Sequence, residues 1–189
     1  MAAVDPAESQ GAEPTIRELL DSAVGTIDEE FTDQPLAEAR LRQVIGSTYY
    51  YLGDNQTGRE QLDRSVRLTR EAIGADNPDC IERARMLAAV HWNRNELQRA
   101  EQLLREALEA SLSTPVPNEE TTADLTSALA TVLSSSGRDS QAAPLYREAI
   151  DRYRAMHPEG HPVLGRTMSG TGTLWTKQGS PSEAEPLVH

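Results

Sequence analysis

The chain has 189 residues, 38% of them hydrophobic and 25% charged, enough for one globular domain or one short array of repeats. Its formal net charge of −12 disfavours a nucleic-acid backbone as the partner. A single cysteine, Cys80, excludes an internal disulfide framework and a cysteine-based zinc cluster. No apolar run approaches the ~20 residues of a membrane span, and no basic-then-apolar leader opens the chain. We therefore expect a cytoplasmic protein that does not associate with membranes.

The N-terminal part divides into an acidic stretch and a helix. Residues 1–13 are expected to be disordered, and residues 14–34 to form a helix that begins with the capping box Thr15-x-x-Glu18. Apolar side chains then recur at helical spacing, at Ile16, Leu19, Leu20, Ala23, Val24, Ile27 and Phe31. We expect this stripe to cover the open edge of the following repeat, so that the segment acts as a capping helix.

From residue 36 onward the sequence repeats with a period of 42 residues. Turn-like positions recur at Gly53, Asn95, Gly137 and Gly179. Small residues recur five positions later, at Gly58, Ala100, Ala142 and Ala184, and seven positions earlier, at Gly46, Ala88, Ala130 and Gly172. Columns kept in register over three or four copies are typical of a repeat protein. The predicted array spans 36–189, with units 36–77, 78–119 and 120–161 and a partial unit 162–189.

Each unit is predicted to contain two helices joined by the turn. In the second unit, apolar residues recur at helical spacing on both sides of Asn95. The small residues Ala88 and Ala100 allow the two helix backbones to approach closely, which a larger side chain would prevent. No stretch alternates apolar and polar residues as a half-buried strand would. The fold class is therefore all-α.

Several phrases of the array carry a specific resemblance. AEQLLREALE (100–109), AAPLYREAI (142–150) and the linker ADNPD (75–79) resemble the tetratricopeptide repeat (TPR) in the 42-residue form of kinesin light chains. The resemblance implies a right-handed α-solenoid of antiparallel helix pairs, in which the first helix of each pair lines a concave groove. It also implies a non-catalytic scaffold that binds a peptide or protein segment in that groove.

A second resemblance lies in TIRELLDSAV and the following DEEFTDQPLAEARLRQVIGSTYYYLGD. These phrases are similar to the segment that joins a bacterial serine/threonine protein kinase domain to its C-terminal repeats. The resemblance implies the sensor or scaffold part of such a kinase, and the catalytic motifs of a kinase are missing from this sequence. Because the last unit stops after 28 residues, we interpret the chain as a fragment of a longer array. A natural stop covered by dimerisation is the alternative.

The candidate catalytic and metal-binding residues are weak. In the segment His157-Pro-Glu-Gly-His161, proline and glycine prevent the regular helix that a two-histidine zinc motif needs. Cys80 has acidic neighbours, and His91 falls in a packing column, so both are interpreted as structural. We predict no catalytic residue, no metal site and no cofactor, and we expect that the protein is not an enzyme.

The residues predicted to contact a partner lie on the groove side of the first helices. They are Arg40, Gln43, Tyr50, Tyr51, Arg85, Trp92, Asn93, Ser127, Arg166 and Lys177. Arginines would pair with carboxylates and the aromatic rings would act as anchors, so the expected ligand carries acidic and apolar side chains. Two alternatives stay open. In the first, Tyr50 and Trp92 only pack against neighbouring helices and bind no partner. In the second, the chain forms a homodimer through an open end of the solenoid.

Overall fold

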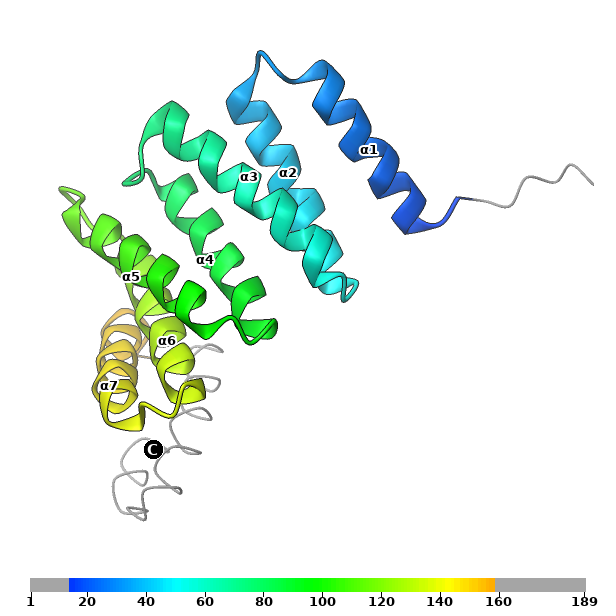
Figure 1. Cartoon of the computed structure of the whole chain (residues 1–189). Coiled ribbons are helices and arrows are strands. Elements are labelled where there is room, and N and C mark those ends of the chain that lie inside the picture. Colours follow the sequence, from blue (N-terminus) through cyan, green and yellow to red (C-terminus); the bar gives the residue numbers. More distant parts are fainter. Residues whose placement is uncertain (1–13, 159–189) are drawn as a thin grey trace, which may run out of the picture.

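The computed structural model describes residues 14–158, and this part of the chain folds into helices with no strand (Figure 1). The helices are α1 (Ile16–Glu30), α2 (Pro35–Tyr51), α3 (Asn55–Ile73), α4 (Pro78–Asn93), α5 (Leu97–Ser113), α6 (Glu119–Ser135) and α7 (Asp139–Met156). The prediction of an all-α fold is confirmed. The expected disorder of residues 1–13 and the partial unit 162–189 lie outside the described residues.

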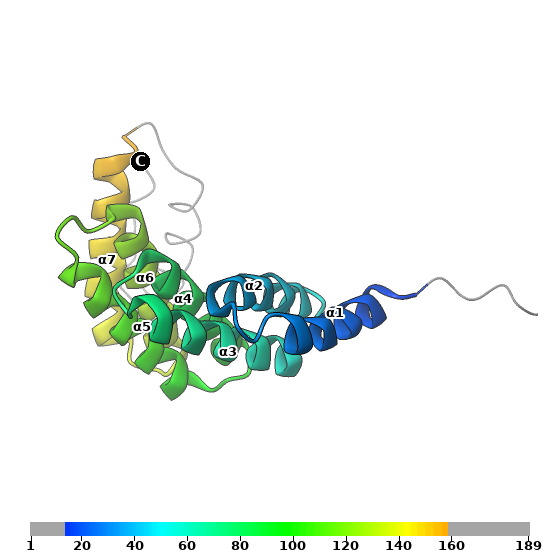
Figure 2. The same ribbon diagram turned by 90° about the horizontal axis from the view of Figure 1, so that it is seen from above.

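The helices form three pairs, α2 with α3, α4 with α5 and α6 with α7, and each pair packs on the next. Seen from above, the stack follows an arc (Figure 2). The first helices of the pairs, α2, α4 and α6, lie on the inner side of this arc, and α3 and α5 lie on its outer side. The structure is therefore an all-α helical repeat, and its inner side is built from one helix of every pair.

The turn inside each pair depends on a residue with a left-handed backbone. Gly53, Asn95 and Gly137 have φ values of 82°, 60° and 73°. Glycine adopts such values without steric cost, and asparagine tolerates them better than most residues. The 42-residue spacing of these residues thus reflects one backbone requirement, repeated in each described turn.

The two helices of each pair meet at small residues. A Cβ atom on Gly46 would lie 2.8 Å from Cγ of Leu62, and one on Gly58 would lie 2.9 Å from the carbonyl oxygen of Gly46. The same columns hold alanine in the later pairs, Ala88 with Ala100 and Ala130 with Ala142, all at most 1% exposed. These columns therefore determine how closely each pair packs.

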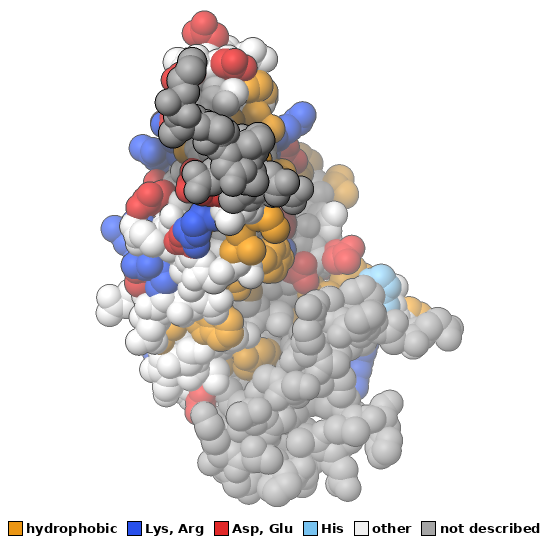
Figure 3. Space-filling model, turned by 90° about the vertical axis from the view of Figure 1, so that its right-hand side faces the viewer, with side chains coloured by type: hydrophobic (Ala, Val, Ile, Leu, Met, Phe, Trp, Pro, Cys, Tyr) orange, Lys and Arg blue, Asp and Glu red, His pale blue; other side chains and the backbone are white. Residues whose placement is uncertain are grey.

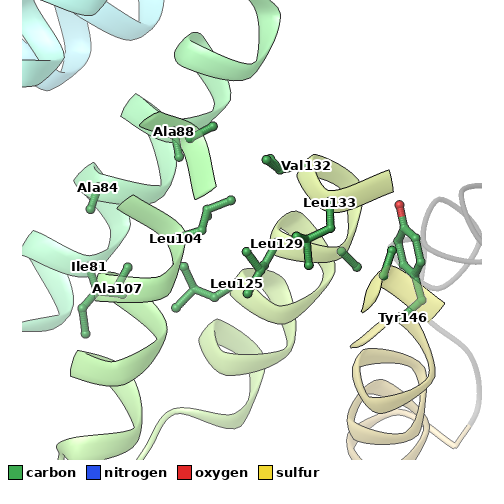
Figure 4. Packing of buried hydrophobic residues seen from close by; sticks show 13 residues of the cluster. Ile81, Ala84, Ala88, Leu104, Ala107, Leu125, Leu129, Val132, Leu133 and Tyr146 are labelled. Carbon is green, nitrogen blue, oxygen red and sulfur yellow. The ribbon is translucent and has the colours of Figure 1, made fainter. Parts of the chain in front are cut away.

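Successive pairs share a continuous hydrophobic core. Its largest part lies between α4, α5, α6 and α7, where Leu104, Leu125 and Leu129 point toward one another (Figure 4). Leu62 of α3 packs with Val90 of α4 in a smaller cluster that extends this core toward the first pair. Packing between pairs thus makes the repeats mutually dependent.

Helix α1 lies on the first pair in the way that the second helix of a preceding pair would. Its Arg17 is 42 residues before Arg59 of α3, and Ile27 packs with Ile45 and Tyr49 of α2. The expected apolar stripe is only partly buried, because Ile16 and Leu19 are 62% and 56% exposed. Leu20, Ala23, Val24 and Phe31 pack in the same cluster as Ile27, so α1 covers part of the edge of the first pair, and its role as a cap stays a prediction. Within the described residues no helix lies across the other side of α1.

A buried ionic network joins α1 to the first pair. Arg42, which is 1% exposed, donates from Nε to Glu38 (2.7 Å), from Nη1 to Gln61 (2.6 Å) and from Nη2 to Asp28 (2.6 Å). Arg64 of α3 adds a contact of 2.8 Å to Glu38. The later pairs have small or hydroxyl residues at the Glu38 and Arg42 columns, so this network is specific to the junction with α1.

Replacing Ala130 by tryptophan should destabilise the fold, because its side chain is fully buried at the contact between α6 and α7. We expect a loss of ~1–3 kcal/mol in the free energy of unfolding, measured by urea denaturation. The control is Gln141→Trp, an exposed position beside Ala142. Equal stability of both variants and the parent would contradict the packing described.

Removing the guanidinium of Arg42 should leave Glu38 buried without its nearest partner. We expect Arg42→Met to lower the free energy of unfolding by about 3 kcal/mol. The double variant Glu38→Leu/Arg42→Met removes both charges and should lose less, because the single variant leaves the buried Glu38 carboxylate with only the partly exposed Arg64 as its cation. A double variant that is less stable than Arg42→Met would show that the network itself contributes the stability.

Candidate protein-binding surface

The described residues that the sequence predicted as partner contacts belong to α2, α4 and α6, whose inner side (Figure 2) is the predicted partner surface. We call this surface the inner face. It contains Arg40, Gln43 and Tyr50 of α2, Arg85, Trp92 and Asn93 of α4, and Ser127 of α6. Arg166 and Lys177 lie outside the described residues. Three helices that are consecutive in the stack thus bring together residues from distant parts of the sequence.

Two hydrogen bonds cross the inner face between neighbouring first helices. Nδ2 of Asn93 donates to Oη of Tyr50, and Nε1 of Trp92 donates to Oγ of Ser135, both at 2.9 Å. Tyr50 and Trp92 occupy the same column of the repeat, and Asn93 and Ser135 occupy the next. Each aromatic side chain is therefore held by the following repeat, while 38% of Trp92 remains exposed. The alternative that these rings pack on neighbours is partly right, since they both contact a neighbour and reach solvent.

Tyr51 differs from the other predicted aromatic residues in its position. It shares a column with Asn93 and Ser135, the residues that reach back to the preceding first helix. No first helix precedes α2 in the described chain, and Tyr51 is 77% exposed. Its ring meets that of Tyr50 edge-on, with centroids 5.4 Å apart. Tyr51 therefore lies at the end of the inner face, where the stack begins.

Arg85 lies near the middle of the inner face and is already paired. Its Nε and Nη2 atoms donate to the two carboxylate oxygens of Glu82, at 2.8 and 2.7 Å. These hydrogen bonds raise the pKa of Arg85. Because the bidentate pair with Glu82 uses only Nε and Nη2 of Arg85, the Nη1 group keeps its N–H donors for another acceptor.

The charges of the described inner face balance. Arg40 is largely exposed, and its Nη2 atom lies 3.9 Å from the Asp79 carboxylate, a distance of weak attraction. Arg40 and Arg85 are matched by Glu82 and Asp124, which occupy the Arg40 column in the later pairs. The other two cations predicted for this surface, Arg166 and Lys177, lie outside the described residues.

Tyr153 of α7 is fully buried but bonds a residue of this surface, and sequence reasoning missed it. Its Oη donates to the carboxylate of Asp124. Burial raises the pKa of Tyr153, and the bond to Asp124 raises it further. The column of Tyr153 holds Ile27, Thr69 and Ser111 elsewhere, so the repeat pattern gave no signal for a phenol ring whose hydroxyl reaches Asp124.

The other reactive side chains have structural surroundings. His91 is 8% exposed, and its Nδ1 lies 2.5 Å from Oε2 of Glu96 in the turn that follows α4. Cys80 is 1% exposed, and burial raises the pKa of its thiol. Within residues 14–158 there is no group of three or more histidine, cysteine or acidic side chains that could hold a metal ion. None of the helices in that range is long and apolar enough to cross a membrane.

Comparisons with known proteins agree with this geometry. Family models described as tetratricopeptide repeat match residues 37–113 and 122–163. No curated protein matches the sequence. Similar solved structures include the nearly identical TPR-like repeats of a kinesin light chain-type protein from Podospora anserina (17% identity, TM-score 0.72, covering 90% of this chain and 81% of that one). The structure of BtubC (BKLC) from P. vanneervenii has 17% identity and a TM-score of 0.76, and the match covers 91% of this chain and 68% of that one. The apo form of RapI has the same identity and TM-score, and the match covers 90% of this chain and 62% of that one. The chain belongs to the tetratricopeptide repeat family.

Proposed function

We propose that the protein is a non-catalytic interaction scaffold whose inner face binds an extended protein segment with apolar and acidic side chains. The observation that carries this proposal is the pair of hydrogen bonds from Asn93 to Tyr50 and from Trp92 to Ser135. They hold two aromatic side chains in fixed orientations on one surface. Tryptophan and tyrosine are frequent anchors of protein interfaces.

Fixing these side chains before binding favours affinity. A ligand that packs on Trp92 does not have to order that ring, so less conformational entropy is lost on association. The ring keeps over a third of its surface exposed, which is area that a partner can bury. An extended segment that orders on binding loses entropy itself, so we expect micromolar affinity, about −8 kcal/mol.

The charges of the inner face support acidic side chains in the ligand. Arg40 is exposed and only weakly paired, and Arg85 keeps the donors of Nη1 after its fork with Glu82. Guanidinium groups bind carboxylates in a planar geometry and form strong charge-assisted hydrogen bonds. A ligand carboxylate near Arg85 must also tolerate Glu82 and Asp124, which favours single acidic residues over an acidic run.

The resemblance of the N-terminal phrases extends this proposal to the sensor or scaffold part of a bacterial serine/threonine kinase. In the structure those phrases correspond to α1, α2 and the segment between them. Sequencing the gene region upstream of this reading frame tests the extension. A kinase domain in the same frame would support it, and a stop codon directly before Met1 would contradict it.

Self-association through an open end of the solenoid is the second candidate function. It is favoured by exposed apolar residues at the start of the stack, of which Val44 and Tyr51 are 65% and 77% exposed. The net charge of −12 opposes it, because association brings like charges together. Light scattering over a hundredfold range of concentration tests it, since a molar mass that rises with concentration would favour the self-association.

Trp92→Ala should weaken binding to the inner face. Peptides of mixed acidic and apolar composition are screened on an array, and the strongest is measured by fluorescence anisotropy. We expect Trp92→Ala to raise Kd at least tenfold (~1.4 kcal/mol) and Trp92→Phe, which keeps a ring, to raise it less. The control is Leu112→Ala, an exposed residue of the outer helix α5. Unchanged binding by Trp92→Ala would contradict the inner-face proposal.

Arg85→Glu should abolish the contribution of a ligand carboxylate, because it places a third acid beside Glu82 and Asp124. We expect Kd for the same peptide to rise at least tenfold while circular dichroism stays unchanged. Arg105→Glu is the matched control, since it makes the same charge change on α5. If both variants weaken binding equally, only the net charge of the chain matters and the assigned site is wrong.

A further inference from the structure

A second surface lies where the stack begins, and neither the fold nor the inner face accounts for it. Six large apolar side chains of α1 and α2 are between 37% and 77% exposed there. They are Ile16 and Leu19 of α1, Leu41, Val44 and Tyr51 of α2, and Leu52 directly after α2. We call this surface the N-terminal edge. Viewed from the side on which α1 lies, the molecule shows hydrophobic side chains gathered in a broken band (Figure 3).

In the later pairs the equivalent face is covered. Leu125 and Val132 of α6 occupy the columns of Leu41 and Thr48, and they are 0% and 3% exposed. Val90 of α4 is likewise buried, against Leu62 and Val66 of α3. The helices that cover α4 and α6 on this side belong to a complete preceding pair, whereas on the same side of α2 the described residues supply α1 alone. Leu41 therefore lies in a column that the later pairs bury, and the column of Val44 holds the partly buried Met86 and Ala128.

A helix that packs on the exposed side of α1 cannot adopt the close helix–helix packing found within the TPR pairs. Ile16 of α1 occupies the column that holds Gly58, Ala100 and Ala142 in the complete pairs. A Cβ atom on Gly58 would already lie within 3.1 Å of the backbone of α2, so an isoleucine at this column prevents the usual close approach. The side of α1 that carries Ile16 therefore fits a helix held further away, with larger side chains between the backbones.

The charges beside the N-terminal edge are acidic. Glu29, Glu30 and Asp33 at the end of α1 are exposed and form no ion pair with any other described residue. Arg40 is the nearby cation on α2, and it faces Asp79. A second copy of the chain would bring another acidic surface, with a net charge of −12, against these carboxylates. Charge complementarity therefore favours a basic partner.

We propose that the N-terminal edge binds an amphipathic helix of another protein, with leucine-like residues on one face and basic residues beside that face. Arg17 near the start of α1 pairs with Asp54, just after α2, and Asp28 near the end of α1 pairs with Arg42. The two helices therefore run antiparallel, and Leu19 lies at the same end as Tyr51. The acids at the end of α1 lie at the opposite end of the edge. The basic residues of the bound helix accordingly gather toward one of its ends.

The test uses the full chain and a fluorescent 18-residue peptide of leucine, alanine and lysine, with leucine at every third or fourth position. Two companion peptides replace every lysine by glutamate, or distribute the leucines evenly around the helix. Anisotropy at physiological salt should show saturable binding of the first peptide and at least tenfold weaker binding of both companions. Equal binding of either companion would overturn the proposal.

Variants of the protein locate the contact. Val44→Glu should weaken binding of the first peptide at least tenfold, and Glu30→Lys/Asp33→Lys should weaken it at least threefold. The control Val116→Glu adds the same charge as Val44→Glu at a residue that is 86% exposed and lies between α5 and α6. Binding that is unchanged in Val44→Glu, or equally weakened in Val116→Glu, would overturn the assignment.

Two further measurements separate this surface from the others. Trp92→Ala should leave binding of the basic peptide unchanged, because Trp92 belongs to the inner face. A failure of the inner-face proposal would therefore leave this result intact. If the chain instead forms a dimer that Val44→Glu dissociates in light scattering, the N-terminal edge is an interface between copies, and the proposal of a basic partner is wrong.

Discussion

The rest of the structure depends on the close approach of two helix backbones at small residues. Where Gly46 faces Gly58, even one added methyl group would meet the opposite backbone or Leu62 at 3 Å or less. Ala88 with Ala100 and Ala130 with Ala142 repeat this approach in the later pairs. Because every pair has nearly the same spacing, the pairs stack in one register and share a core that runs from α3 to α7. The curvature that separates inner from outer helices follows from this regular stacking.

The same regularity explains the two surfaces. On the inner face, two columns of the repeat lie next to each other in neighbouring repeats. Their residues form the hydrogen bonds between Tyr50 and Asn93 and between Trp92 and Ser135, and these bonds hold the side chains in place. At the N-terminal edge the repetition is interrupted, so Leu41, which shares a column with the buried Leu125, remains 37% exposed. Helix α1 is anchored there by the ionic network of Arg42 and only partly replaces a preceding pair.

Much of the fold could be predicted because it depends on residue size and backbone conformation, which a periodic sequence displays directly. The turn column of Gly53, Asn95 and Gly137 and the small columns are of this kind. The buried pair of Glu38 and Arg42 could not be predicted, since charges at this spacing usually mark a solvated helix face. The pairing of Arg85 with Glu82 and the hydrogen bond from Tyr153 to Asp124 were also missed. Both depend on the directions of side chains, and residue spacing allows these contacts but does not determine that they form.

We propose that partners bind across the inner face at the side chain of Trp92. The most direct measurement follows the indole N–H signals of the chain by NMR during titration with a peptide obtained from the array. The sequence has two tryptophans, Trp92 and Trp175, and the spectrum of Trp92→Phe assigns their signals. We predict that the Trp92 signal shifts or broadens in proportion to the bound fraction, because its N–H bonds Ser135 at the contact. Saturation with peptide while the Trp92 signal stays unchanged would contradict the account.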